Sequence, residues 1–286
     1  MTTLRDLITG ELPVMAPLVL NPLMAKLAEQ AGFKALYLGG GATGYLKCVT
    51  EANLNLSEMC QAALDIKTVS SLPLILDGAC GWGDPMHMHR TIGMSEAAGF
   101  AAIEIEDQIL PKRAHHHVGL EHIIPAELMA EKIREAVAAR RSRDFLIIAR
   151  TNAARGEGLD EALRRAAMFE KAGADLLLVL AKTPDQVGLI GERVAAPKVL
   201  LAAGDAVRST GLSMRDLSRL GYKLVIDAST PLMAAHKVWR ECFAAMARGE
   251  PVGLLGAGGA KVEEAELHKT IGLEHMLAIE KRTVER

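Results

Sequence analysis

"FLIIARTNAARGEGLDEALRRAAMFEKAGADLLLVL" (residues 145–180) is the stretch that decides the fold. It opens with an apolar run over residues 145–150, continues as a helical pattern over residues 159–171 and ends in a second apolar run over residues 175–180. Near-continuous apolar runs are expected where a parallel sheet is covered on both faces. Gly173 follows the helical pattern and is expected to end the helix in a left-handed conformation. The stretch therefore predicts a strand–helix–strand unit.

The same alternation of strand and helix patterns occurs along most of the chain. The other expected strands cover residues 14–20, 35–38, 73–77, 101–106, 198–203 and 223–227. Helical patterns include residues 126–139 and 233–247. Eight such units predict a parallel (β/α)₈ barrel, with a doubly wound open sheet as the alternative. We expect a single barrel domain over residues 1–286, with a C-terminal helical extension over about residues 260–286 that reads as one helix from Val262 to Lys281.

Composition excludes several classes of function. The 33 Lys and Arg against 35 Asp and Glu give a formal charge of −2. The chain therefore lacks the excess of positive charge that is typical of proteins that bind nucleic acid. The apolar runs have the length of strands and are too short to span a membrane. Four cysteines without a CxxC pair, and no signal peptide, favour the cytoplasm.

Charged and glycine residues gather where the expected strands end. Asp77 ends the third strand, Glu106 the fourth and Arg150 the fifth, while residues 39–44 follow the second. In a (β/α)₈ barrel these ends meet at one mouth, where the chemistry of such enzymes lies. Carboxylates hold hard cations such as Mg²⁺, an arginine grips a carboxylate with two hydrogen bonds, and glycine N–H groups receive an anion. The pattern predicts a site for a small carboxylic acid.

A short charged segment, "EIEDQILPKRAHHHVG" (residues 104–119), follows the fourth strand. Its basic half, from Lys112 to Gly119, has no apolar anchor before Val118 and is expected to close over a bound anion. Imidazole titrates near neutral pH, so His115 or His116 is a candidate acid or base. The alternative is a solvated loop whose histidines have no chemical role. Cys80 has no base beside it in the sequence, so a structural role is favoured for it.

Six blocks of the chain together resemble the isocitrate lyase and phosphoenolpyruvate mutase superfamily. Among them are "LPLILDGACGWGD", "AAIEIEDQILPKR", "IIARTNA" and "LGYKLVI", and the resemblance covers nearly the whole chain. It implies a barrel that exchanges its last helix with a neighbour, in dimers or dimers of dimers. It also implies cleavage of a C–C or C–P bond beside a carboxylate, through an enolate of a 2-oxo acid held by Mg²⁺, with Mn²⁺ as a possible substitute.

The resemblance assigns roles residue by residue. Asp77 matches the aspartate that reaches the metal, and Glu106 the glutamate that acts on it through water. Arg150 matches the arginine that binds the substrate carboxylate, and Lys112 the lysine at the base of the mobile catalytic loop. The substrate-binding turn is matched by Tyr37, Gly39, Gly40 and Gly41.

Several positions depart from the superfamily pattern. Gly39 stands in place of a serine, and Ala79 in place of the second aspartate of an Asp-x-Asp motif. Ala114 replaces the lyase cysteine that protonates the departing enolate, and Asn53 stands for an aspartate on the loop after the second strand. The missing cysteine argues against isocitrate or methylisocitrate cleavage and favours a reaction that needs no acid there, such as decarboxylation.

We therefore predict a Mg²⁺-dependent C–C bond-cleaving enzyme, a decarboxylase or lyase, for a small 2-oxo or 2-hydroxy di- or tricarboxylate. Its expected catalytic residues are Lys112, His115, His116 and Arg150, with Asp77 also contacting substrate. One alternative is a barrel that binds a small carboxylate without turnover. The other is a C–C or C–P hydrolase or mutase of the same superfamily.

Overall fold

Eight parallel strands form the centre of the molecule. The computed structural model describes residues 2–204 and 206–285. The strands are β1 Val14–Pro17, β2 Leu36–Leu38, β3 Leu74–Asp77, β4 Ala102–Glu106, β5 Leu146–Thr151, β6 Leu176–Val179, β7 Lys198–Ala202 and β8 Tyr222–Asp227. Each lies within, or one residue beyond, an expected strand, and the order of pairing is β1-β8-β7-β6-β5-β4-β3-β2.

The sheet closes on itself. β1 pairs with β8, and a bridge between Leu18 and Tyr37 joins the remaining edges of β1 and β2. At this bridge the Val19 N–H donates to the Tyr37 carbonyl at 2.8 Å. The expected (β/α)₈ barrel is confirmed, because a doubly wound sheet would leave both edge strands unpaired.

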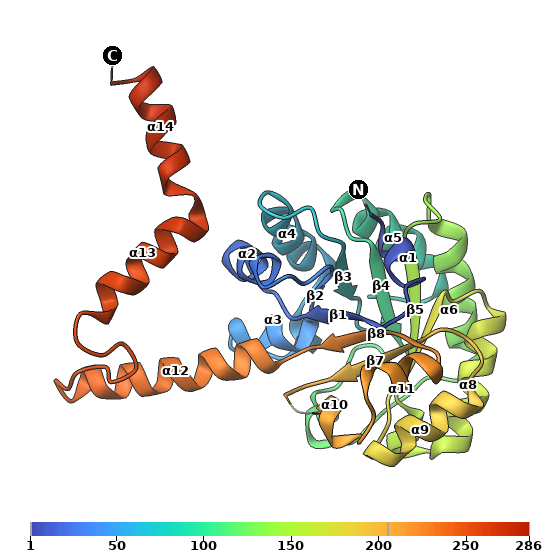
Figure 1. Cartoon of the computed structure of the whole chain (residues 1–286). Helices are drawn as coiled ribbons and strands as arrows, with labels where there is room; N and C mark the ends of the chain where they lie inside the picture. The colour runs from blue at the N-terminus through green and yellow to red at the C-terminus, as the bar shows by residue number, and fades with distance from the viewer. Residues whose placement is uncertain (1, 205, 286) are drawn as a thin grey trace.

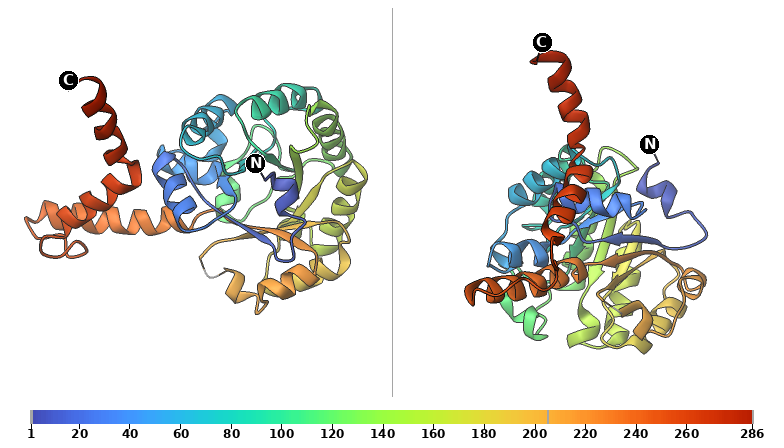
Figure 2. Two further views of the ribbon diagram at one scale, coloured as in Figure 1. Left: turned by 45° about the horizontal axis from the view of Figure 1, so that its top comes forward. Right: turned by 60° about the vertical axis from the view of Figure 1, so that its left-hand side comes forward.

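Helices surround the barrel on its outside (Figures 1 and 2). The covering helices are α2 Pro22–Gln30, α4 Leu56–Lys67, α5 Met88–Ala97, α6 Ala126–Ala139, α8 Leu159–Lys171, α9 Pro184–Arg193 and α11 Met214–Arg219. Shorter pieces in the connections are α1 Leu4–Leu7, α3 Gly40–Leu46, η1 Glu51–Asn53, η2 Pro85–His87, η3 Ala114–Val118, α7 Ala153–Gly156 and α10 Ala206–Ser209.

Periodic burial explains how a covering helix attaches to the sheet. In α6 the fully buried apolar side chains are Ala126, Met129, Ala130, Ile133 and Ala136, which lie on one stripe at helical spacing. Burying one such large side chain contributes about 1.5–3 kcal/mol. Gly173, after α8, has a φ of +101° and ends that helix as expected, because this backbone conformation is strained for residues with a Cβ.

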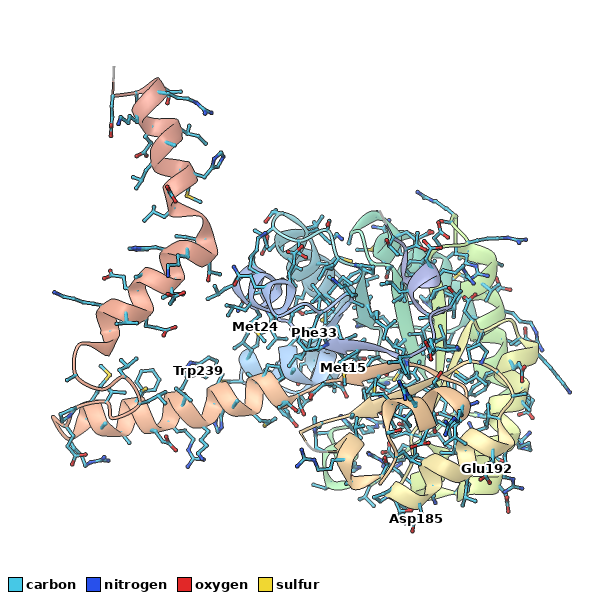
Figure 3. The ribbon with its side chains drawn as sticks, viewed as in Figure 1. Met15, Met24, Phe33, Asp185, Glu192 and Trp239 are labelled. Atoms are coloured by element: carbon cyan, nitrogen blue, oxygen red, sulfur yellow. The ribbon has the colours of Figure 1, made fainter. Side chains whose placement is uncertain are left out.

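The C-terminal region leaves the barrel. α12 Thr230–Ala247 extends away from the sheet, and α13 Gly259–Ile271 and α14 Leu273–Thr283 continue the arm (Figures 1 and 2). Trp239 on α12 lies well away from the strands (Figure 3). The expectation of one tail helix is wrong: Gly272 has a φ of +72° and divides the tail into two helices. None of the residues described in α13 and α14 is buried.

The region described contains no helix with both the length and the apolar character needed to cross a membrane.

Candidate active site

The strand register brings the predicted charged residues together. Asp77 on β3 lies opposite Glu104 on β4, and Glu106, two residues further along β4, lies opposite Arg150 on β5. Side chains two apart on a strand share a face, so Glu104 and Glu106 both join this group. The predicted convergence of Asp77, Glu106 and Arg150 at one barrel mouth is found, and Glu104 is an additional member.

Arg150 is held between the two glutamates of β4. Its guanidinium donates to Glu104 Oε1 at 2.8 Å and lies 3.4 Å from Glu106 Oε2. Its Nε donates to Asn152 Oδ1 at 3.0 Å, and the Asn152 amide donates to Glu106 Oε2 at 2.9 Å. The side chain is 15% exposed, so it is not fully enclosed by these partners. A substrate carboxylate would compete with Glu104 for this arginine.

Glu104 is the acid that the sequence interpretation missed. Burial raises the pKa of its carboxyl to about 7, against the opposing effect of Arg150, and Asp77 raises it further. The Tyr37 hydroxyl donates to Glu104 Oε2 at 3.4 Å. The signal was present as "EIE": two glutamates two apart in an otherwise apolar strand must share one face.

The glycine turn after β2 donates a hydrogen bond to Asp77. Its Gly40 N–H donates to Asp77 Oδ2 at 2.8 Å, and the Ala79 N–H donates to Oδ1 at 3.0 Å. The Gly40 N–H is therefore hydrogen-bonded to a protein carboxylate, and its role in binding a substrate anion stays a prediction. Gly39 precedes α3 and Gly41 lies in its first turn. A Cβ on Gly39 would approach the Tyr37 ring within 3.1 Å, which disfavours the superfamily serine here.

Lys112 points into the acids. Its ammonium lies 2.5 Å from Glu51 Oε1 and is also bonded to Glu106 Oε1. The side chains of Lys112, Glu51 and Glu106 are only 5%, 9% and 2% exposed. Although burial raises the pKa of both glutamates, His116 and Lys112 together hold that of Glu51 below the usual range, and Lys112 and Arg150 do the same for Glu106. The three groups form a buried ion cluster.

Glu51, on η1, supplies the carboxylate that the superfamily pattern places at the position of Asn53. Its carboxylate faces Lys112, and a Cβ on Gly40 would meet Glu51 Oε2 and Asp77 Oδ2 at 3.1 and 3.2 Å. Asn53 is exposed and accepts a hydrogen bond from the Thr50 hydroxyl. The acid of this loop is thus two residues earlier than the superfamily pattern suggested.

The three histidines of η3 have different polar partners. His116 is half-buried, with Nε2 2.7 Å from Glu51 Oε1. Burial lowers the pKa of His116, but Glu51 raises it, and the net pKa lies above the usual value. His115 contacts His122 at 3.1 Å, and His117 contacts the Tyr45 hydroxyl at 2.9 Å. Only His116 of these three adjoins the ion cluster.

Asp107 lies behind the mouth. It is fully buried and accepts from the Thr151 hydroxyl at 2.7 Å, the Asn152 N–H at 3.0 Å and Arg165 at 3.2 Å. These bonds hold the segment after β5, and with it Asn152, against Glu106. Asp107 is therefore part of the support for the site.

The donor set suits a hard divalent cation. Four carboxylates, of Glu51, Asp77, Glu104 and Glu106, face the cations of Lys112 and Arg150 and the imidazole of His116, so the acids outnumber the basic groups. Within the described parts of the chain, no three His, Cys, Asp or Glu side chains are grouped closely enough to hold a metal alone. Mg²⁺ does not require such a cage, because it keeps several waters and binds through one or two carboxylates. The Lys112 ammonium lies among the same acids.

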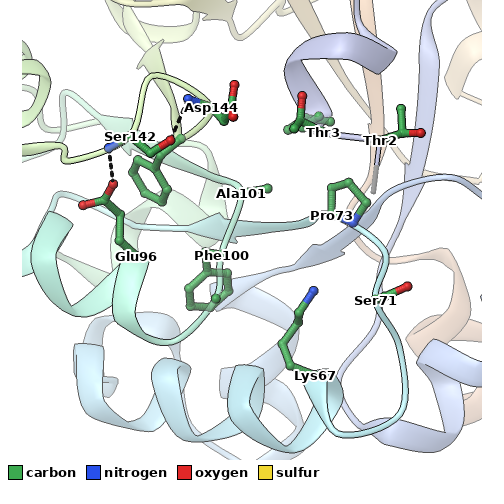
Figure 4. Close-up of a pocket in the computed structure, with 13 residues that line it drawn as sticks. Thr2, Thr3, Lys67, Ser71, Pro73, Glu96, Phe100, Ala101, Ser142 and Asp144 are labelled. Carbon is green, nitrogen blue, oxygen red and sulfur yellow. Dashed lines mark hydrogen bonds between the residues drawn. The ribbon is translucent and has the colours of Figure 1, made fainter.

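Two cavities lie at opposite ends of the barrel, and one of them adjoins this mouth. A cavity of about 370 Å³ adjoins the ion cluster and is lined by Glu51, Lys112 and a group of apolar side chains. A second hollow, of about 300 Å³, is lined by Thr3, Lys67 and Glu96 (Figure 4). Its wall includes residues that precede β3, β4 and β5, so it lies at the opposite end of the barrel.

Comparison with known proteins identifies the family. The family model for phosphoenolpyruvate phosphomutase matches residues 4–247.

The chain belongs to this family. It is similar to a 2-methylisocitrate lyase of Aeropyrum pernix, 39% identical over 82% of this chain and 75% of the relative. A 2,3-dimethylmalate lyase of Eubacterium barkeri is 31% identical over 97% of this chain and 96% of the relative. Among solved structures, a phosphonopyruvate hydrolase in complex with oxalate and Mg²⁺ has a TM-score of 0.85, 32% identity and 98% coverage of each chain. The superfamily recognised from the sequence is thereby confirmed.

Proposed function

We propose that this phosphoenolpyruvate phosphomutase family member is a Mg²⁺-dependent enzyme that cleaves a C–C bond in a small 2-oxo or 2-hydroxy di- or tricarboxylate. The observation that carries the proposal is the buried excess of carboxylates around Lys112 and Arg150 at the barrel mouth. Relatives named as lyases and as oxaloacetate decarboxylases support the reaction class.

Asp77 is the proposed direct ligand of the metal, with Glu106 acting through water. Glu51 is a further candidate for contact through water, because its carboxylate lies beside Asp77. A bound Mg²⁺ would polarise the 2-oxo or 2-hydroxy oxygen of the substrate as a Lewis acid. Mn²⁺, which takes similar oxygen ligands, is the proposed substitute.

Arg150 anchors one substrate carboxylate through the exposed part of its guanidinium. In the bond-breaking step of a decarboxylation, the bond between the leaving carboxylate and the adjacent carbon breaks and CO₂ departs. Its electron pair stays on the remaining fragment as an enolate. The buried cations of Lys112 and Arg150 favour a fragment that carries this negative charge.

A proton must then reach the enolate carbon. His116 is the proposed donor, because Glu51 keeps its imidazole protonated to a higher pH than usual. His115 lies against His122 instead, so it is the weaker candidate. Ala114 offers no acid in the position of the lyase cysteine, which makes oxaloacetate-type decarboxylation the first reaction to test.

Turnover of a panel of substrates tests the proposal. Oxaloacetate, methylisocitrate, dimethylmalate and phosphonopyruvate are each incubated with the protein and Mg²⁺, Mn²⁺ or a chelator, and the products are separated. We expect metal-dependent release of CO₂ or of a 2-oxo acid. Mg²⁺-dependent thermal stabilisation by oxalate without turnover of any member would instead identify a binding protein.

The C-terminal arm is proposed to pack on a second copy of the chain in a homo-oligomer, a dimer or a dimer of dimers. Only Leu232 and Ala245 are buried in α12, while Trp239, Phe243 and Met246 are 45%, 69% and 63% exposed. A run of large apolar side chains is uncommon on a free surface. Sedimentation of the full chain at micromolar concentration tests this, and a stable monomer would contradict it.

The cytoplasm is the proposed location, since all four cysteines are free thiols, as a reducing compartment would keep them.

A further inference from the structure

A buried lysine on α6 has no part in the mechanism above. Lys132 is 2% exposed, and among the buried residues that the structure describes in α6 it is the one that carries a charge. Burial lowers the pKa of its ammonium, so this position disfavours the charged form. An apolar side chain would complete the buried stripe of α6 without that penalty, so packing alone does not explain the lysine.

The ammonium of Lys132 reaches the loop after β3. It donates a hydrogen bond to the carbonyl oxygen of Cys80. The nearby carboxylate of Glu106 is ion-paired with Lys112 and Arg150 instead. Lys132 therefore acts on the backbone of the loop rather than on a carboxylate.

A second side chain holds the next carbonyl of the same loop. Thr91, on α5, is 3% exposed, and its hydroxyl donates to the Gly81 carbonyl oxygen at 2.9 Å. α5 and α6 pack against each other in the outer layer of the barrel. Two consecutive carbonyls of the β3 loop, defined as residues 78–84, are thereby fixed by side chains of the covering helices.

The β3 loop depends on such support because its backbone is strained. Ala79 and Trp82 have φ values of +44° and +54°, a region that is unfavourable for residues with a Cβ. Backbone strain of this kind persists only where the surroundings enforce it. A loop that loses one of its fixing hydrogen bonds is therefore expected to relax to another conformation.

The β3 loop is also bonded to both acids proposed to bind the metal. The Ala79 N–H donates to Asp77 Oδ1 at 3.0 Å, and the Glu106 N–H donates to the Ala79 carbonyl at 2.9 Å. A shift of residue 79 would therefore change the orientation of both acids. Groups that orient the ligands of a metal in this way strongly affect its affinity.

We propose that Lys132 is a positioning residue of the metal site: by fixing the Cys80 carbonyl, it holds the β3 loop in the conformation that orients Asp77 and Glu106 for Mg²⁺. The inference rests on the proposed function, because it assumes that Mg²⁺ binds at this mouth. Lys132 acts through its hydrogen bond and not through its charge, because a positive charge close to Mg²⁺ would oppose binding of the cation.

The sign of the change in Mg²⁺ affinity tests the inference. Mg²⁺ is titrated calorimetrically into the full chain in the presence of oxalate, for the parent protein and for Lys132→Met. Removal of a nearby positive charge would by itself tighten Mg²⁺ binding. Loss of the positioning hydrogen bond should instead weaken it roughly tenfold or more, as is typical of groups that orient metal ligands. Lys132→Arg, which can still donate to the Cys80 carbonyl, should restore most of the affinity.

A second buried lysine provides the matched control. Lys198 is also 2% exposed, and its ammonium donates to the carbonyl oxygens of Val194 and Ala196. It is the first residue of β7, so it lies at the end of the barrel opposite the mouth. Lys198→Met removes the same kind of buried ammonium and should destabilise the chain, but it should keep the Mg²⁺ affinity of the parent.

Tryptophan fluorescence follows the β3 loop without metal or turnover. The chain has two tryptophans, and Trp239→Phe leaves Trp82 of the β3 loop as the only one. In that background and without Mg²⁺, Lys132→Met should shift the emission of Trp82, whereas Lys198→Met should leave it unchanged.

A variant of Thr91 carries the test should Lys132→Met not fold. Thr91→Val keeps the shape of the side chain and every charge of the protein, but it removes the hydroxyl bonded to the Gly81 carbonyl. It should shift the emission of Trp82 and weaken Mg²⁺ binding. If it retains the emission and the Mg²⁺ affinity of the parent, fixing the loop carbonyls has no bearing on the metal and the inference is overturned.

The other outcomes separate the inference from the proposed function. If the parent binds Mg²⁺ and Lys132→Met binds it equally well or more tightly, the inference is overturned and the proposed function stands. If Lys132→Met and Lys198→Met lose Mg²⁺ affinity equally, the loss comes from general destabilisation and the inference is also overturned. If the parent itself binds no Mg²⁺ in the presence of oxalate, the proposed metal dependence fails and the inference fails with it.

Discussion

Replacing Lys112 by methionine tests the buried ion cluster directly. Methionine keeps most of the length of the side chain but removes the ammonium that lies between Glu51 and Glu106. Glu51 would retain His116, and Glu106 would retain Asn152 and Arg150. Two carboxylates that are less than 10% exposed would then lose their shared cation.

Removal of one partner from a buried ion pair typically costs about 3–5 kcal/mol, because the remaining charge stays buried without compensation. We expect a loss of this size at pH 7. At about 2 °C per kcal/mol for a chain of this size, the melting temperature should fall by roughly 6–10 °C.

The loss should depend on pH. Lys112 lowers the pKa of Glu51 and Glu106, so in the parent protein these groups contribute stability above the pKa of an unfolded glutamate, about 4.3. That contribution disappears as the pH falls through the lowered pKa values of the folded state. In the variant, burial still favours the neutral form of both carboxyls while one of the charges that lowered their pKa is gone. The variant's carboxyls therefore take up protons as the pH falls from 7 towards 4, so the difference between variant and parent should be largest near pH 7 and shrink towards pH 4.

Thermal unfolding of both proteins between pH 4 and 8, with and without Mg²⁺, measures these effects. Mg²⁺ should stabilise Lys112→Met more than the parent, because a divalent cation can replace the missing positive charge. Lys26→Met is the control: Lys26 is 40% exposed and lies 3.7 Å from Glu29, so its loss should cost less than about 1 kcal/mol. If Lys112→Met is no less stable than this control at pH 7, the lysine does not occupy the acid cluster in solution and the reasoning is refuted.

Other consequences can be measured separately. Asp77→Ala should abolish Mg²⁺-dependent thermal stabilisation; unchanged dependence would remove Asp77 as the ligand. His116→Gln should lower kcat at least tenfold with little change in KM, whereas His115→Gln should stay within about twofold, corresponding to about 0.4 kcal/mol; equal effects in steady-state assays would refute the assignment. The pKa of Glu104, raised to about 7, means that Arg150 is released from its charged partner as the pH falls below 7, so oxalate affinity should rise towards pH 6. Glu104→Gln should flatten that pH dependence in calorimetric titrations, and a parallel slope in both proteins would contradict it.

The barrel and part of its mouth could be predicted because their signals are local. Apolar runs of strand length, helical stripes such as that of α6 and a glycine such as Gly173 act over a few residues, and each encodes its own element. Once eight parallel strands are inferred, the ends of neighbouring strands must meet. The proximity of Asp77, Glu106 and Arg150 follows from topology, and the strand register bears it out.

The direction of side chains on loops depended on the tertiary structure. Lys112 was expected on a gating loop over the mouth, yet its ammonium lies among acids that come from η1 and β4. Glu51 was not recognised because η1 has no periodic pattern, and only the approach of Lys112 and Asp77 reveals which acid of that loop faces inward. The sequence does not distinguish the three adjacent histidines. In the structure, His116 is the one of the three that lies next to Glu51.

The sequence alone thus determined the eight-unit barrel and the set of strand-end groups, because hydrophobic periodicity and chain connectivity are sufficient to specify them. Tertiary structure decided which charges pair, which pKa values shift, and where the apolar cavity beside Ala79 opens. It also decided that the tail bends at Gly272 and that α13 lies in contact with α2. These features arise from contacts between segments far apart in the chain, whose burial and electrostatic energies no local pattern contains.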